Sequence, residues 1–306
     1  MGGAALRSRA PAAEEGSTGA AAPRKLAPGL YVVATPIGNL GDLSPRALET
    51  LAAADAVVCE DSRITGALLH RFGLDKPLVV YNDHSAPRVR PQLIARLAQG
   101  AALALVSDAG TPAISDPGYR LVKEAHEAGI PVRCVPGPSA PIAALSIAGL
   151  PTDRFLFAGF LPPRREARRR ELAALGAIPV TLVLLERGSR LPELLADAAE
   201  LLGPRTAVVA RELTKIHEEV RRGTLADLAA VYRTGPPPRG EIVVLLGPPE
   251  RDAQEASEAA IDAALLEAAA RLPPGRAARE VAAATGRKAE ELYRRLQRLR
   301  AERTEG

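Results

Sequence analysis

Short apolar runs alternate with amphipathic stretches through the first half of the chain. The amphipathic stretches have the hydrophobic spacing of helices, and this order is typical of a mostly parallel sheet covered by helices on both faces. Ser44 before Pro45 marks the start of the first helix, and Gly129 marks the end of the last one. We predict strands over residues 30–34, 56–59, 78–81, 102–106 and 132–135, and helices over residues 44–54, 64–72, 91–99 and 119–128.

The pattern changes near Leu150. Residues 151–163 hold three of the four phenylalanines, and a basic run follows over residues 164–170. We therefore place a domain boundary between Leu150 and Phe155. In the second domain we predict strands over residues 180–185, 207–210 and 242–246, helices over residues 192–202 and 225–231, and a turn over residues 236–241.

Both ends of the chain differ from these two domains. Residues 1–27 are rich in Ala, Gly, Pro and Ser without periodicity, which predicts a disordered tail. Beyond Pro249 the chain is Ala-rich and helical, and Gly286 with the spacing of Leu292, Leu296 and Leu299 predicts a small helical hairpin. The predicted organisation is a tail (residues 1–27), an α/β domain (28–150), a second α/β domain (151–249) and a basic helical segment (250–306).

Three strands of the first domain end in loops of glycine, proline and small polar residues. These loops are Ala-Thr-Pro-Ile-Gly-Asn-Leu at 34–40, Ser-Asp-Ala-Gly-Thr-Pro at 107–112 and Pro-Gly-Pro-Ser-Ala at 136–140. Such turns let the backbone approach a ligand closely, and several of them at one end of a parallel sheet build a small-molecule site. One loop alone could be an ordinary strand-to-helix connection; three favour the site.

Composition limits the function classes. The 306 residues are 47% hydrophobic but only 3% aromatic, without tryptophan, so any nucleic-acid contact would depend on charge rather than on base stacking. Cys59 and Cys134 lie in apolar runs, which predicts buried, reduced thiols. Two cysteines and four histidines have no ligand spacing, so we expect no metal. No apolar stretch has the length of a membrane span or signal peptide, which favours the cytoplasm.

With three further segments, the loops resemble a known family. The segments are Glu-Asp-Ser-Arg at 60–63, Ser-Asp-Pro-Gly at 115–118 and Arg-Glu-Leu-Thr-Lys at 211–215. Over residues 30–247 the chain resembles the ribosomal RNA small-subunit methyltransferase I family, which has the tetrapyrrole-methylase fold. The resemblance implies two α/β domains with the cofactor cleft between them. It also implies a cytoplasmic homodimer that uses S-adenosylmethionine to methylate the 2′-oxygen of a cytidine ribose in 16S ribosomal RNA.

Given this resemblance, the glycine and proline loops become the predicted cofactor site. Methyl transfer needs the donor carbon and the acceptor oxygen held at attack distance, which closely approaching loops provide. For Asp108 the alternative is a turn or helix-capping aspartate. The predicted cofactor residues are Pro36, Asp108, Ala109, Gly110, Thr111, Ile114, Ser115, Pro136, Gly137, Pro138 and Ser139.

A ribose hydroxyl is a poor nucleophile until a base draws its proton away. His84 is the best candidate on chemistry because imidazole titrates near neutral pH, and the alternative is a surface loop histidine. Asp42 and Asp61 are rival candidates. Asp61 lies between Glu60 and Arg63, so residues 60–63 could instead form a structural salt-bridged turn.

The basic run after the domain boundary is the predicted contact with RNA phosphates, and the alternative is a solvated helix face. Its residues are Arg164, Arg165, Arg168, Arg169 and Arg170. The partner that the resemblance implies is 16S RNA within the 30S subunit, and free 16S RNA stays open as an alternative substrate. Residues 271–306 hold ten Lys or Arg against five Glu, and this end could contact RNA or ribosomal protein, or keep the chain soluble.

Three rival functions follow from the same residues. A methyltransferase acting on a corrinoid or other tetrapyrrole would share the fold, but a compact macrocycle does not need such widely spread positive charge. A non-catalytic RNA-binding assembly factor would bind RNA without the cofactor. A dinucleotide-dependent dehydrogenase is disfavoured because the first strand is followed by Gly38-Asn39-Leu40-Gly41 rather than by a G-x-G-x-x-G fingerprint.

Overall fold

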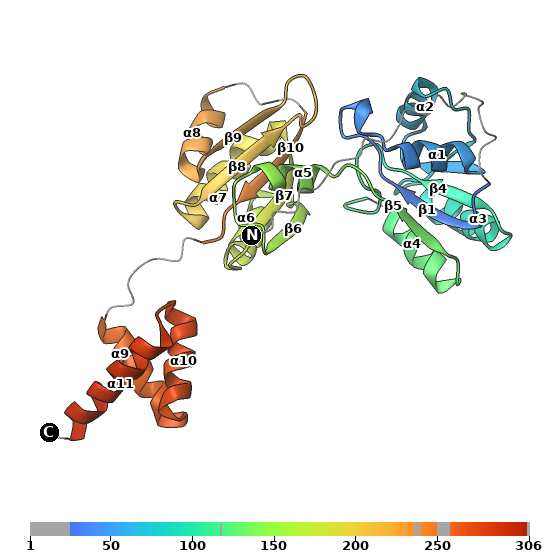
Figure 1. Cartoon of the computed structure of the whole chain (residues 1–306). Coiled ribbons are helices and arrows are strands. Elements are labelled where there is room, and N and C mark those ends of the chain that lie inside the picture. The colour runs from blue at the N-terminus through green and yellow to red at the C-terminus, as the bar shows by residue number, and fades with distance from the viewer. Residues whose placement is uncertain (1–24, 117, 236–237, 239, 250–257, 305–306) are drawn as a thin grey trace, which may run out of the picture. The chain divides into compact units, whose positions relative to one another are not determined.

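A computed structural model describes residues 25–116, 118–235, 238, 240–249 and 258–304 of the chain (Figure 1). Of the predicted tail, residues 1–24 lie outside the described residues, as do residues 236, 237 and 239 of the turn predicted over residues 236–241. The chain divides into two compact units, Met1–Ala143 with Leu213–Ile216 and Ala144–Glu212 with His217–Gly306. The division falls in α5 (Ala140–Ile147), a few residues before the boundary predicted near Leu150.

The first unit is built on a five-stranded sheet in the order β3-β2-β4-β1-β5. Every pair of neighbouring strands is parallel, which confirms the sheet type expected from the alternation of strands and helices. The strands are β1 (Gly29–Val33), β2 (Ala56–Cys59), β3 (Leu78–Val80), β4 (Ala102–Leu105) and β5 (Val132–Val135).

Helices cover both faces of this sheet. Alternate strand residues point to two separate cores, one packed against α1 and α2 and the other against α3 and α4. Leu103 belongs to the core on one face and Ala104 to the core on the other. The helices are α1 (Pro45–Ala53), α2 (Ser62–Arg71), α3 (Ala86–Ala98) and α4 (Gly118–Glu127).

Local capping explains where these helices begin. Ser44 Oγ accepts a hydrogen bond from the Ala47 amide at 3.1 Å, which confirms the predicted cap of α1. Helix α3 begins at Ala86, earlier than predicted, because Pro87 takes the first-turn position. Pro91, which the sequence placed at the helix start, lies inside α3, where its missing amide proton removes one helical hydrogen bond.

The second unit contains a mixed five-stranded sheet in the order β6-β7-β10-β8-β9. Strands β6 and β7 are parallel, and the other neighbours are antiparallel. One sheet face packs on a core shared with three helices. The elements are β6 (Phe155–Phe160), α6 (Arg165–Gly176), β7 (Thr181–Arg187), α7 (Leu191–Leu202), β8 (Thr206–Arg211), β9 (Glu219–Thr224), α8 (Leu225–Thr234) and β10 (Glu241–Leu246).

Beyond residue 257 three helices form a small bundle: α9 (Glu258–Arg271), α10 (Pro274–Thr285) and α11 (Ala289–Thr304). Leu265 and Leu296 are fully buried in its core, and Leu292 and Leu299 pack in the same cluster. Gly286 caps α10 in the left-handed conformation at φ 71°. The predicted hairpin is thus confirmed and consists of α10 and α11. Helix α9 packs against the same core and completes the three-helix bundle.

The two cysteines have different surroundings. Cys59 is a buried free thiol, as predicted, but Cys134 is exposed, so the prediction of two buried thiols is wrong. The reason is that Cys134 lies on β5, an edge strand of the first sheet. Across the ranges that the structure describes, we find no helix with the length and hydrophobicity that a membrane crossing requires.

Candidate active site

The three glycine and proline loops follow three adjacent strands, β4, β1 and β5. The loops are tied together by hydrogen bonds. The Thr35 amide donates to Gly110 O at 2.9 Å, the Gly110 amide donates to Thr35 O at 3.1 Å, and Thr111 Oγ1 donates to Pro138 O at 3.0 Å. The structure therefore gathers the predicted cofactor residues of all three loops at one edge of the sheet.

This edge is also a topological switch point. The connection after β1 packs on one face of the sheet through α1, whereas the connection after its neighbour β4 packs on the opposite face through α4. In open α/β sheets, ligands usually bind beyond the carboxyl ends of the strands at such a switch point. Pro36 belongs to the loop after β1, and Asp108 to the loop after β4.

Two glycines allow these loops to pack closely. Gly110 has φ +78°, and a Cβ there would lie 3.3 Å from Ile37 Cγ2. A Cβ on Gly137 would lie 3.0 Å from Ala34 Cβ. A Cβ at either position would press on the neighbouring loop, where the contacted side chain would have to move by a few tenths of an ångström.

The loop after β4 also contains strained backbone. Ala113 and Ser115 have φ values of 68° and 57°, a conformation that L-residues with a side chain rarely adopt. Ile114, between them, is 52% exposed. Strain of this kind costs about 1–3 kcal/mol per residue and gathers at ligand sites, which supports this loop as part of the predicted cofactor wall.

Carboxylates gather next to the loops. The Asp61 amide donates to Asp108 Oδ1 at 3.1 Å, which joins the carboxyl end of β2 to the loop after β4. Partial burial, followed by the fields of Asp108 and Asp116, raises the pKa of Glu60. Burial likewise raises the pKa of Asp108 and of Asp116, although each carboxylate accepts a backbone hydrogen bond. Burial and neighbouring carboxylates disfavour the charged form of each group, and a nearby cation would offset this effect.

Asp61, a predicted base, is already engaged. Its carboxylate caps α2 by accepting from the Arg63 amide at 2.8 Å and also accepts from the Arg63 guanidinium at 2.5 Å. These hydrogen bonds lower the pKa of Asp61 to about 2. A carboxylate of such low basicity is a weak proton acceptor, so the geometry favours the structural-turn interpretation of residues 60–63 for Asp61.

The other two predicted bases lie far apart in the sheet order. His84 is exposed in the turn between β3 and α3, and β3 is separated from β1 by both β2 and β4. Asp42 ends the short 3-10 helix Leu40–Asp42 after β1. Its Oδ2 atom is buried without a hydrogen-bond partner in the part of the chain that the structure describes. The structure does not bring His84 and Asp42 together, and their catalytic roles stay predictions.

Glu60 is a candidate base that the sequence did not single out. In the sequence Glu60 stands out only as the neighbour of Asp61, because its closeness to Asp108 and Asp116 depends on folding. One signal was available: Glu60 directly follows a buried strand, as the predicted site loops do. Unlike Asp61, its pKa is raised, so it is the stronger proton acceptor of the two.

The raised pKa of Glu60 gives a prediction for stability. A carboxyl whose pKa is higher in the folded than in the unfolded protein stabilises the fold below its ordinary value of 4.5 and loses that contribution as pH rises through the folded pKa. We therefore expect Glu60→Gln to raise the free energy of unfolding at pH 7 and to leave it unchanged below pH 4.5. Denaturant unfolding at both pH values measures this.

Asp61→Asn is the matched control for Glu60→Gln. The pKa of Asp61 is lowered, so this variant should destabilise the protein at pH 7, and its effect should fade as pH falls toward 2. Equal effects of the two variants at pH 7 would contradict the assignment of opposite pKa shifts.

A four-residue strap, Leu213–Ile216, belongs to the first unit although β8 and β9 on either side belong to the second. The Lys215 side chain lies over Gly38, where a Cβ would overlap the Lys215 Cγ. Glu212 and Thr214 hold positive φ values of 50° and 67° around the buried Leu213. The Arg-Glu-Leu-Thr-Lys segment therefore places a lysine beside the loop that follows β1.

The basic run forms the start of α6, and most of it is engaged in ion pairs. Arg168 is 1% exposed and its guanidinium lies 2.8 Å from Asp197 Oδ2, so the prediction that Arg168 contacts RNA is wrong. The buried carboxylate of Asp197 needs this cation, which explains the burial. Two further arginines also pair with Asp197 or Glu200: Arg165 and Arg169.

Burial acts to raise the pKa of Asp197, but hydrogen bonds from Arg168, Arg169 and Arg165 outweigh it and lower that pKa. Two arginines of the run, Arg164 and Arg170, are exposed and have no ion pair among the described residues. These two remain the strongest predicted phosphate contacts of the run.

Within the described ranges, no three His, Cys, Asp or Glu side chains are grouped so that they could hold a metal ion.

Comparison with known proteins decides the family. The model described as Tetrapyrrole (Corrin/Porphyrin) Methylases matches residues 29–229, more than half of the chain. This chain belongs to the tetrapyrrole methylase family. It is accordingly a methyltransferase that uses S-adenosylmethionine. A second model, described as RsmI C-terminal HTH domain, matches residues 255–300.

Several relatives of this tetrapyrrole methylase are nearly as long as the chain itself. The Ribosomal RNA small subunit methyltransferase I of Mesorhizobium japonicum is 52% identical over 92% of this chain and 96% of its own length. The protein of the same name from Erythrobacter litoralis is 51% identical over 90% and 96%. The crystal structure of uroporphyrin-III-C-methyltransferase from Thermus thermophilus is 25% identical and matches with a TM-score of 0.51 over 71% of this chain and 93% of that one. The predicted fold class and family are thereby confirmed.

Proposed function

We propose that this methylase transfers the methyl group of S-adenosylmethionine to the 2′-oxygen of a cytidine ribose in the 16S RNA of the small ribosomal subunit. The observation that carries the proposal is the identity of about half of all residues with relatives named for small-subunit ribosomal RNA methylation. The cytidine and its 2′-oxygen follow from the family resemblance of the loops.

The residues of the first unit fit such a cofactor. Gly110 and Gly137 leave open the two positions where a Cβ would press on neighbouring loops, so the backbone can approach a ligand. The carboxyl groups of Glu60, Asp108 and Asp116 suit a positively charged ligand. Their charges repel one another, so a nearby cation would stabilise their ionised forms. We assign the predicted loop residues, from Pro36 to Ser139, to cofactor binding on this basis.

Bound S-adenosylmethionine supplies a methyl group on a sulfonium sulfur, and in-line attack by the ribose oxygen forms the C–O bond while the S–C bond breaks. The contribution of the chain is to hold the loops rigid through the Thr35–Gly110 and Thr111–Pro138 hydrogen bonds. The proton of the 2′-hydroxyl must pass to a base. Glu60 suits this role better than Asp61, with His84 and Asp42 as the remaining candidates.

The exposed arginines Arg164 and Arg170 are proposed to contact RNA phosphates. The resemblance extends the proposal to a cytoplasmic homodimer that acts on RNA within the 30S particle. Light scattering of the purified protein tests the dimer.

The decisive experiment measures transfer of a radiolabelled methyl group to unmodified 30S subunits, to free 16S RNA and to a tetrapyrrole precursor. We expect label on RNA only, and mass spectrometry of the digested RNA to place it on a cytidine 2′-oxygen. Label on the tetrapyrrole would assign the activity to the small-molecule alternative. Binding of RNA without any cofactor binding would instead favour a non-catalytic assembly factor.

A further inference from the structure

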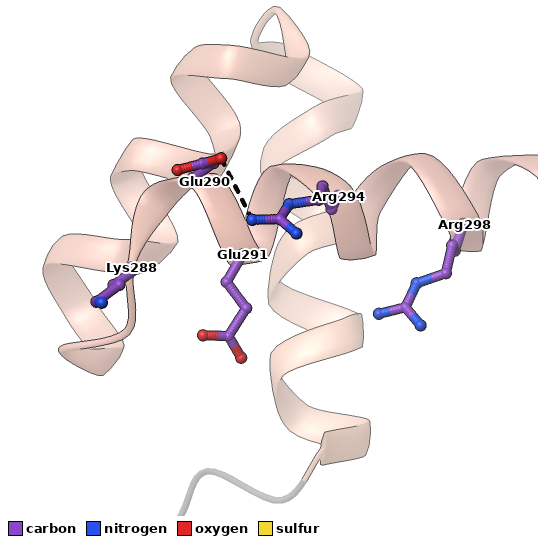
Figure 2. A pocket seen from close by; sticks show the side chains of 5 residues that line it. All are labelled: Lys288, Glu290, Glu291, Arg294 and Arg298. Carbon is purple, nitrogen blue, oxygen red and sulfur yellow. Dashed lines mark hydrogen bonds and ion pairs between the residues drawn. The ribbon is translucent and has the colours of Figure 1, made fainter.

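The exposed side of α11 carries a shallow basic cavity. The cavity has a volume of about 650 Å³ and is lined by Lys288, Glu290, Glu291, Arg294 and Arg298. Figure 2 shows these side chains along α11 and the turn before it, with Arg294 and Arg298 extending from the same helix. Residues four apart lie on one helix face, so Arg294 and Arg298 lie one turn apart on the same face of α11, with a backbone rise of about 6 Å between them. We call this set of five residues the α11 cup.

The cations of the α11 cup are available to a ligand. Glu290 pairs with Arg294 at 3.2 Å, and Glu291 pairs with Arg287, which lies outside the cup, at 3.3 Å. The Glu290 and Arg294 side chains are 83% and 73% exposed, so their pairing contributes at most about 1 kcal/mol and yields readily to a stronger anion. Lys288 and Arg298 are exposed and have no ion pair in the described part of the chain.

The opposite side of α11 is fixed by buried contacts. Leu292 and Leu296 are buried in the core of the three-helix bundle. Arg295 donates two hydrogen bonds to the Asp262 carboxylate on α9, at 2.5 and 3.0 Å. Because this side is anchored, the α11 cup is held in a defined position rather than carried on a mobile tail.

The charge of the bundle is divided between its helices. In the sequence, α9 has three acidic residues and one arginine, whereas α10 and α11 with their connecting turn have nine basic residues and four acidic ones. Helix α11 follows α10 across a short turn, and the matching family model is described as a helix-turn-helix domain. In that motif the second helix is the one that meets nucleic acid.

We propose that the α11 cup binds the phosphate backbone of ribosomal RNA through Lys288, Arg294 and Arg298. This inference rests on the proposed function, which makes RNA the substrate class. It assigns the contact to phosphates rather than to base edges, because the deep, narrow major groove of an RNA helix does not admit side chains. The cup thus contributes affinity for RNA that does not depend on the RNA sequence, and it does so through residues other than those of the cofactor loops.

The test is RNA affinity of the full-length protein as a function of salt. Filter binding of a 16S RNA fragment is measured at several KCl concentrations for wild type and for Lys288→Ala/Arg294→Ala/Arg298→Ala. Because each lost phosphate contact lowers the salt slope by about 1, we expect the slope to fall by two to three and Kd to rise about tenfold or more at low salt. The reaction rate at saturating RNA and the melting temperature should not change.

A matched variant removes three charges from the same bundle outside the cup: Arg271→Ala/Arg276→Ala/Arg279→Ala. It should retain most of the RNA affinity, whereas Glu290→Gln/Glu291→Gln, which removes carboxylates from the cup, should tighten binding. If both triple variants lost the same amount of RNA affinity, the loss would reflect net charge rather than the cup, and the proposal would be overturned. Unchanged binding of free RNA by the cup variant, with weaker binding of 30S particles, would assign the cup to a ribosomal protein and also overturn it.

The binding readout separates this inference from the proposed function. A wild-type protein that binds RNA through the cup but transfers no methyl group to it would overturn the proposed function alone. A wild-type protein that methylates RNA, with a cup variant that binds as tightly as wild type, would overturn this inference alone.

Discussion

Arg168→Ala is expected to lower the free energy of unfolding by about 3 kcal/mol or more, because it leaves the buried Asp197 carboxylate without its main partner. Arg165 and Arg169 still reach Asp197, which keeps the loss below that of a completely isolated buried charge. Chemical denaturation at neutral pH measures the change. RNA affinity, measured at a temperature at which the variant stays folded, should equal that of wild type.

Arg170→Ala is the control, since it removes an arginine two positions away. Arg170 is exposed, so its loss should change stability by no more than about 0.5 kcal/mol while weakening RNA binding. If Arg168→Ala were as mild as Arg170→Ala, the buried ion pair would not have the structural role that its geometry indicates.

Gly110→Ala is expected to abolish most cofactor binding. The new side chain costs about 1–2 kcal/mol in a left-handed backbone conformation and would lie 3.3 Å from Ile37 Cγ2. The loops after β1 and β4 would separate where Thr35 and Gly110 exchange two hydrogen bonds. We expect the affinity for S-adenosylmethionine, measured by calorimetry, to fall at least about tenfold, in line with a loss of about 1.4 kcal/mol or more.

Gly73→Ala separates backbone strain from displacement of the loops. Gly73 has φ +68°, close to that of Gly110, but no atom lies within 4 Å of its added Cβ. This variant should lose a similar amount of stability and keep wild-type cofactor affinity. An equal loss of cofactor affinity in both variants would mean that general destabilisation, not the loop contact, explains the result.

Local patterns predicted much of the fold and the site loops. Strands such as β2, with four buried residues in a row, and caps such as Ser44 depend on neighbouring residues, so the sequence shows them directly. Strand β9 was missed because the Glu-Val-Arg-Arg-Gly-Thr segment of this edge strand is mostly exposed and lacks apolar alternation.

Contacts between distant residues were out of reach of the sequence. The Asp61 amide meets Asp108 across 47 residues, and Arg168 meets Asp197 across 29. The first contact brings Asp108 close to Glu60, and because the sequence does not show this closeness, it does not indicate Glu60 as a candidate base. The second contact buries Arg168 against Asp197, whereas the sequence alone places Arg168 in a basic run that is expected to be exposed.

The strap Leu213–Ile216 has a consequence for synthesis of the chain. The first unit is complete only after these residues emerge, yet its continuous part ends at Ala143. At a translation rate of about 5–20 residues per second, roughly 70 further residues take about 4 to 15 seconds to make. During that interval the surface at Gly38 stays without its Lys215 cover, so the last segment of the first unit to dock is made after most of the second sheet has been synthesised.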